Sequence, residues 1–156
     1  MLKKNKYVIF WLDNQKFALH LSNVERVVRI VEVSPLSKTP KYIFGTINFQ
    51  GEFLPVINLR ILCDLNDRDI DLNDQLIITN TTKIKVALWV DCVSDIIERE
   101  DEEIIESDKI LMKSKYNEGA FKFNDELVVI HDLDTFLNFN EKSLLKSINK
   151  KKVVNI

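Results

Sequence analysis

The chain has 156 residues, of which 46% are hydrophobic, enough to fill one sizeable core or two small cores side by side. Its formal net charge is −2, from 24 acidic and 22 basic residues, which lacks the strongly basic balance typical of nucleic-acid-binding proteins. No apolar run approaches the about 20 residues that span a bilayer, and two cysteines are too few for a disulfide framework, so we expect a cytoplasmic protein with reduced thiols.

Short apolar runs separated by turn residues predict a mostly β fold. Such strands at close intervals, with few long helices, favour a barrel or a sandwich. In chain order, the predicted strands span residues 7–12, 17–21, 27–33, 43–49, 52–57, 75–79, 84–93, 95–100, 121–123 and 127–130.

Two local signals punctuate the first half of the chain. Ser22 and Asn23 are placed to cap one helical turn over residues 24–26, because a side-chain oxygen accepts hydrogen bonds from free N–H groups at a helix start. Gln50-Gly51 separates two apolar runs and predicts a tight β-hairpin turn, since glycine adopts positive φ at little cost.

Helical segments are predicted to be few and short. Residues 59–65 resemble a short helix, and the polar residues 66–69 that follow are the best candidate for a subdomain boundary. Near the C-terminus, residues 132–139 and 141–152 carry apolar side chains at helical spacing. The sequence therefore predicts small β subdomains with short helices.

Two cysteines and two histidines are the candidates for a zinc site or a catalytic pair: His20, Cys63, Cys92 and His131. Structural zinc sites usually present their ligands in close pairs, whereas these four residues lie about 30 to 40 positions apart. A Cys–His catalytic pair lacks an evident Asn or Asp that would orient it. We interpret both histidines as polar residues on the outer face of a sheet.

Other ligand-binding patterns are weak. The acidic run of residues 95–108 lacks the alternating ligands of a calcium loop, so a solvated linker is the preferred interpretation. Three glycines are too few for a phosphate-binding loop, and Trp89, inside an apolar strand, is predicted to be half-buried. With no reactive constellation and no cofactor motif, the sequence predicts a binding module that is not an enzyme.

Three stretches resemble the CheW-like domain family, and their order and spacing are more specific than any one motif. They are residues 7–28, beginning YVIFWLDNQKFAL, residues 39–60, containing TPKYIFGTINFQG and PVINLR, and residues 86–97, VALWVDCVSDII. The resemblance predicts one CheW-like domain over residues 6–139, with two subdomains that divide near residues 65–74. A C-terminal helix or tail would follow over residues 140–156.

The resemblance implies two packed five-stranded, SH3-like β-barrels with a hydrophobic seam between them. It also implies a non-enzymatic role without a cofactor, coupling the cytoplasmic tips of chemoreceptors to the regulatory domain of a CheA-type histidine kinase. The protein would then be recruited from the cytoplasm to membrane-associated receptor arrays, with no nucleic-acid partner and no direct membrane insertion.

The family's receptor-facing surface corresponds here to six residues: Val24, Arg26, Asn48, Gln50, Ile77 and Ala87. Arg26 stands where the family usually has glutamate, and Gln50 stands where it has arginine. Asn58 replaces a usual aspartate, and Ala87 a common glycine. Because charge complementarity governs specificity, we expect the first two departures to alter partner choice more than fold. The resemblance assigns no kinase-contact residues.

These departures leave several interpretations open. The protein couples a divergent set of receptors, or it is a specialised paralogue that serves a non-flagellar motility pathway. Alternatively, Glu25 and neighbouring charges restore the usual surface. A self-associating array scaffold is a further alternative, and a small enzyme that uses Cys63 or Cys92 with a histidine is the alternative of a different class.

Overall fold

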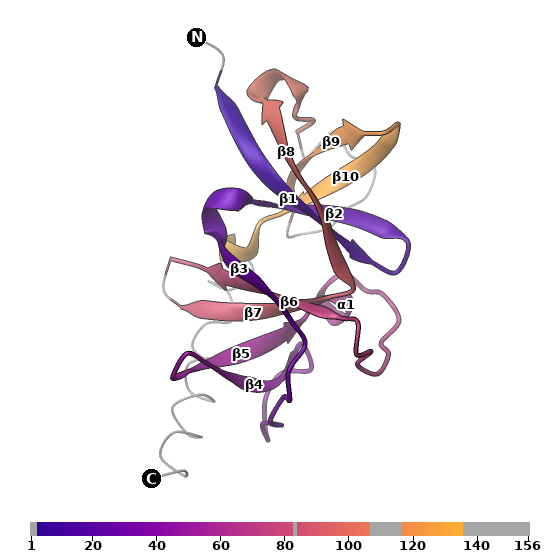
Figure 1. The fold of residues 1–156 in the computed structure, drawn as a ribbon. Coiled ribbons are helices and arrows are strands. Elements are labelled where there is room, and N and C mark those ends of the chain that lie inside the picture. The colour runs from indigo at the N-terminus through magenta and orange to yellow at the C-terminus, as the bar shows by residue number, and fades with distance from the viewer. Residues whose placement is uncertain (1–2, 83, 107–116, 136–156) are drawn as a thin grey trace.

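A computed structural model of the protein describes residues 3–82, 84–106 and 117–135. Within these ranges, ten strands form two five-stranded sheets that are stacked one above the other in Figure 1. The predicted mostly β architecture of two small barrels is confirmed. No helix among the described residues is long and apolar enough to cross a membrane.

The first sheet, here called the terminal sheet, combines strands from both ends of the described chain in the order β8-β1-β2-β10-β9. The strands β1 and β2 form a hairpin, and β2 pairs in parallel with β10. The strands span β1 Lys4–Leu12, β2 Gln15–His20, β8 Cys92–Glu100, β9 Asn117–Phe123 and β10 Glu126–His131.

The second sheet, here called the central sheet, is built from the middle of the chain in the order β3-β6-β7-β5-β4. Its strands β5 and β7 are parallel, and its other neighbours are antiparallel. The strands span β3 Val24–Arg29, β4 Ile43–Phe49, β5 Glu52–Asn58, β6 Gln75–Asn80 and β7 Lys85–Val90. The short helix α1, Leu59–Leu62, follows β5 directly.

The chain passes between the two sheets at two points. The first crossing is the 3-10 turn η1, Leu21–Asn23, between β2 and β3, and the second is Asp91, between β7 and β8. Residues 65–74, where the sequence suggested a subdomain division, connect α1 to β6 and so remain beside the central sheet.

Each sheet curls so that its outer strands are linked at the backbone. In the central sheet, Ser34 and Thr46 exchange two backbone hydrogen bonds of 2.8 Å across the open edge. Gly45 is required at this contact, because a Cβ there would lie 2.3 Å from the Ser34 carbonyl oxygen. In the terminal sheet, Ile105, which follows β8, exchanges backbone hydrogen bonds of 2.7 and 3.0 Å with Ala120 of β9, and the Arg99 side chain adds a 3.1 Å hydrogen bond to the Lys122 carbonyl.

Successive residues of the inner strands face different cores, as the period of two in a β-strand requires. On β7, Val86, Leu88 and Val90 belong to the seam core between the sheets, whereas Ala87 and Trp89 belong to the core inside the central barrel. Strands buried on both faces read as unbroken apolar runs rather than as an alternating pattern.

The terminal sheet follows the same alternation. On β1, Tyr7 and Ile9 pack inside the terminal barrel, and Phe10 and Leu12 pack in the seam. The described residues therefore form three apolar cores, one inside each barrel and one between them. The seam core packs the two barrels against each other.

Several local predictions differ from the structure. The helical turn forms at Leu21–Asn23, and Val24 already begins β3, because residues 24–29 pair with β6. The apolar run of residues 84–93 is two strands, interrupted at Asp91 where the chain changes sheet. Trp89 is fully buried rather than half-buried, since it fills the central barrel. The helix predicted over residues 132–139 lies outside the described residues from residue 136 onward, and the helix predicted over residues 141–152 lies outside them entirely.

Truncation of one seam side chain tests this packing. Leu88→Ala removes buried methyl groups from the seam core and leaves a cavity, so the free energy of unfolding should fall by about 2–5 kcal/mol in a urea titration. Leu72→Ala, the same change at a side chain that is 88% exposed, should stay within about 0.5 kcal/mol of the wild type. Equal effects of the two substitutions would contradict a packed seam.

Candidate functional site

The β4–β5 hairpin turns sharply at Gln50-Gly51, as the sequence predicts. Phe49 pairs with Glu52 across a two-residue loop, and Gln50 and Gly51 have φ values of +50° and +86°. Positive φ at both positions is the geometry of the turn type that matches the right-handed twist of hairpin strands. The Asn48 side chain accepts a 3.1 Å hydrogen bond from the Gly51 N–H and supports the turn.

The hairpin ends beside one open end of the central barrel, here called the hairpin mouth: Glu25, Arg26, Phe49, Glu52 and Lys85. Lys85 lies between two carboxylates, with its Nζ 3.0 Å from Glu25 and 3.8 Å from Glu52. Its hydrogen bond to Glu25 raises the pKa of the Lys85 ammonium. The guanidinium of Arg26 lies over the Phe49 ring, 5.8 Å from its centroid.

Four of the six residues predicted to face a receptor lie at or next to this mouth. Val24 and Arg26 are on β3, whereas Asn48 and Gln50 are on the β4–β5 hairpin. Arg26, Asn48 and Gln50 are exposed, and Val24 is half-buried against the seam core. The mouth therefore brings together residues about 24 positions apart in the sequence, through the curl of the central sheet.

The other two predicted residues lie inside the protein. Ile77, on β6, is fully buried in the seam core, and Ala87, on β7, is fully buried in the central barrel. Neither side chain reaches the surface in this structure. Their contribution to a docking surface would be to shape the sheet beneath it.

A buried arginine ties the two sheets together near the other end of the central barrel. Arg60, on α1, has no exposed side-chain surface and forms ion pairs with Asp91 and, at 3.2 Å, with Asp13. Asp13 lies in the β1–β2 turn of the terminal sheet, and its backbone N–H donates a 2.7 Å hydrogen bond to Asp91. One side chain thus links α1, the β1–β2 turn and the crossing between the sheets.

A second arginine extends this group of charges. Arg68 pairs with Asp74 through two hydrogen bonds of 2.7 and 2.8 Å and reaches Asp91 at 2.7 Å. Its hydrogen bond to Asp74 raises the pKa of the Arg68 guanidinium. Trp89 donates a 2.8 Å hydrogen bond from Nε1 to Asp74. We call Asp13, Arg60, Arg68, Asp74 and Asp91 the Arg60 network.

Asp74 is ionised within this network although it is buried. Burial alone raises the pKa of its carboxyl group, but hydrogen bonds from Arg68, from the Asp71 N–H and from Trp89 outweigh it and hold the pKa below its usual value. The network is a structural device that closes one end of the central barrel. Arg60 falls within the short helix predicted over residues 59–65, and the sequence contains no signal that its side chain is buried.

The zinc and catalytic hypotheses gain little from the geometry. The structure brings Cys63 and His131 together, with Sγ 3.4 Å from Nε2, but Cys92, which is exposed, and His20, which is half-buried, lie elsewhere. Burial raises the pKa of the Cys63 thiol to about 12 and lowers that of His131 to about 4, so both groups are neutral near pH 7. A neutral thiol is a poor nucleophile and a poor metal ligand.

His131 also corrects an expectation, because it is buried rather than on an outer face. Its ring packs against Phe17, with a centroid distance of 4.8 Å, and against Phe10 at 6.1 Å. The imidazole therefore serves the seam core as an aromatic side chain.

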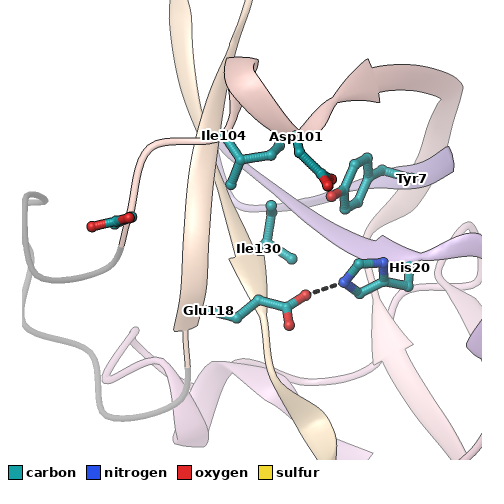
Figure 2. Close-up of a pocket in the computed structure, with 7 residues that line it drawn as sticks. Tyr7, His20, Asp101, Ile104, Glu118 and Ile130 are labelled. Atoms are coloured by element: carbon teal, nitrogen blue, oxygen red, sulfur yellow. Dashed lines mark ion pairs between the residues drawn. The ribbon is translucent and has the colours of Figure 1, made fainter. Parts of the chain in front are cut away.

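A pocket of about 290 Å³ opens on the terminal barrel (Figure 2). His20 pairs there with Glu118 of β9, close to the Tyr7 ring, while Ile104 and Ile130 supply apolar walls. The hydrogen bond that the His20 ring donates to the Glu118 carboxylate outweighs burial and raises the pKa of His20. His20 thus links the end of β2 to β9, on the far side of β10 in the sheet order.

The acidic run is more ordered than a solvated linker over its first part. Residues 95–100 belong to β8, and Asp101–Glu103 form the 3-10 turn η2, whose Glu103 carboxylate accepts a 2.9 Å hydrogen bond from the Glu100 N–H. Among the described residues, no three His, Cys, Asp or Glu side chains are grouped as a metal site would require. Residues 107–108 of the run lie outside the described part.

Comparisons with known proteins agree with the two-barrel geometry. The CheW-like domain matches residues 6–141. The chain is 24% identical to "Chemotaxis protein CheW" of Klebsiella aerogenes over 93% of this chain and 89% of that protein. It is 26% identical to "Chemotaxis protein CheW" of Thermotoga maritima over 87% of this chain and 89% of that protein.

A solved structure with the same fold has been described as a scaffolding protein. It is TtCheW from Thermoanaerobacter tengcongensis, with a TM-score of 0.76 and 27% sequence identity. The superposition covers 83% of this chain and 89% of that chain. The similarity therefore extends over both barrels rather than over one.

Removal of the buried arginine tests the Arg60 network. Arg60→Ala removes a fully buried side chain and one partner of both Asp13 and Asp91, although Asp91 keeps its contact with Arg68. The free energy of unfolding should therefore fall by about 1–3 kcal/mol in a urea titration. Arg29→Ala, the same change at an exposed position of β3, should have an effect within about 0.5 kcal/mol. A small loss for Arg60→Ala would show that the network is dispensable.

The two histidines should titrate far apart in an NMR experiment that follows their ring protons. His20 should titrate above pH 6.5, and His131 near pH 4. Glu118→Gln should lower the pKa of His20 and leave that of His131 unchanged. Similar pKa values for both rings would contradict the burial of His131.

The same titration has a consequence for stability. Since the folded-state pKa of His131 lies below its unfolded value, the unfolded chain binds a proton that the folded chain excludes. The stabilising contribution is complete above pH 6.5 and is lost as the pH falls toward about 4. In His131→Phe the free energy of unfolding should depend less on pH in this window.

Proposed function

This chain belongs to the CheW-like domain family, the non-enzymatic scaffold proteins of chemotaxis, and from that premise we propose that it couples chemoreceptors to a CheA-type histidine kinase. The observation that carries the proposal is the match over residues 6–141, which includes both barrels and the seam. In this role the protein acts by holding two partners in a fixed relation, at receptor arrays on the cytoplasmic side of the membrane.

The packing between the two barrels supports a coupling role. The seam core joins the barrels through fully buried side chains of both sheets, such as Phe10 and Leu88, and the Arg60 network joins them again at the second crossing. A scaffold of this kind transmits the position of one partner to the other, because its two halves do not slide against each other.

We assign the receptor contact to the hairpin mouth and its neighbours Val24, Asn48 and Gln50. A receptor tip would dock there as a helical hairpin, with apolar anchors at i, i+3 and i+4 spacing. Ile77 and Ala87 are buried, in the seam core and in the central barrel respectively, so in this proposal they act only through the strands β6 and β7 that carry them. An individual contact of micromolar affinity corresponds to about −8 kcal/mol and gains strength from the repetition of contacts in an array.

The kinase contact is proposed to use one of the two barrels. Each barrel carries an exposed apolar side chain on an accessible strand, Phe53 on β5 of the central sheet at 42% exposure and Ile96 on β8 of the terminal sheet at 63%. Such side chains are typical anchors of protein–protein contacts. They provide matched positions at which to test each barrel.

Calorimetry with the CheA regulatory domain encoded in the same genome tests the coupling role. We expect micromolar binding by the wild type and a loss of at least about tenfold in affinity for either Phe53→Asp or Ile96→Asp, but not for both. The unaffected variant is the matched control, because it introduces the same charge on the other barrel. Absence of wild-type binding up to hundreds of micromolar would reject the kinase-coupling role.

A further inference from the structure

Arg26 is the cation of the hairpin mouth that is left without a carboxylate. Among the described residues, the ion pairs of this mouth join Lys85 to Glu25 and Glu52, and none involves Arg26. Glu25 therefore does not neutralise its neighbour on β3, although it is adjacent in the sequence. The carboxylate of Glu25 instead pairs with Lys85, which also lies near Glu52, the other acid of the mouth.

The position of Arg26 is held by an aromatic ring rather than by an ion pair. Its guanidinium lies 5.8 Å from the centroid of Phe49, whose half-buried ring packs on the core of the central barrel. Contact with a ring uses the flat face of a guanidinium, and the N–H groups at its edge stay available for hydrogen bonds. These donors match the two oxygens of a carboxylate.

The surroundings of Arg26 leave room for a partner. The Gln50-Gly51 turn beside Phe49 projects freely, since a Cβ placed on Gly51 would meet no atom within 4 Å. Gln50 adds a neutral side chain here, so no second cation competes for the same anion at the turn. The mouth therefore presents the guanidinium of Arg26, which lies over the Phe49 ring, next to an open turn.

We propose that the hairpin mouth selects a receptor helix that carries a carboxylate opposite Arg26. This inference rests on the proposed coupling function and specifies the partner of the same surface. Charge complementarity determines the choice: a tip with Asp or Glu at this position pairs with Arg26, whereas a tip with Lys or Arg is repelled. The alternative, in which Glu25 restores a negative surface, is disfavoured because Lys85 already neutralises that side chain.

The test uses the full chain and cytoplasmic-tip fragments of the chemoreceptors encoded in the same genome. Arg26→Glu should lower the affinity for an acidic tip at least about tenfold, as expected when attraction becomes repulsion at a docking surface. Arg29→Glu is the matched control, with the same charge change at an exposed position on the same strand, and should stay within about twofold. Urea titrations of both variants check that they are folded.

A charge exchange makes the test specific. Each acid of the tip is replaced in turn by arginine, and one such fragment should bind Arg26→Glu more tightly than it binds the wild type. If Arg26→Glu unfolds, Arg26→Gln replaces it and should weaken binding and flatten its dependence on salt. Unchanged binding by the Arg26 variants, while the wild type binds tips, would overturn the carboxylate inference and leave the coupling function intact. Failure of the wild type to bind any tip would instead reject receptor coupling itself.

Discussion

The ion pairs of Arg60 are the constraint on which the arrangement of the two barrels depends. A guanidinium with no exposed surface must be matched by negative charge, because an unpaired buried charge is strongly destabilising. The matching groups, Asp13 and Asp91, come from the first turn of the terminal sheet and from the point where the chain leaves the central sheet. These ion pairs are directional and therefore favour one register between the barrels. Apolar packing in the seam is not directional and would by itself specify that register less strictly.

The groups that hold the two barrels together, here called the frame, are separate from the surface that we propose contacts a receptor. The frame consists of the three cores and the Arg60 network, in which Arg60 and Asp74 are buried whereas Asp13, Asp91 and Arg68 are partly exposed. The hairpin mouth lies at the opposite end of β7 from Trp89 and Asp91, so changes of charge at Arg26 or Gln50 do not touch the network. A scaffold built in this way can change partners by substitution at one mouth without losing the geometry that relates the two partners.

Much of this fold could be predicted from the sequence, because the signals were local. The Gln50-Gly51 hairpin and the apolar strands were found from turn residues and from β-branched runs. The assignment of strands to the two sheets could not be predicted from local signals, because it depends on pairing between distant segments. The strand β2, for example, pairs with β10, which lies more than 100 positions away in the sequence. Short polar residues such as Asp91 give no sign that they end one strand and begin another.

The candidate site was predictable to a smaller degree. Arg26 and Gln50 were singled out by a family resemblance, which assigns them to a receptor-facing surface but cannot say which charges on that surface remain unpaired. That depends on Lys85, which reaches Glu25 from a different strand. The burial of Ile77 and His131 could not be predicted either. A single apolar residue or a single histidine does not indicate which face of a strand its side chain occupies.

The order of strands in the terminal sheet has a consequence for synthesis. All five strands of the central sheet lie between residues 24 and 90, so this barrel can close while the rest of the chain is still being made. The β1–β2 hairpin is made earlier but must wait for β8, β9 and β10, and until then its apolar faces are uncovered. On the ribosome the central barrel is therefore the first surface on which that hairpin can be covered. The seam can form in part at that stage, and Val129 and Leu133 complete it when β10 has been made.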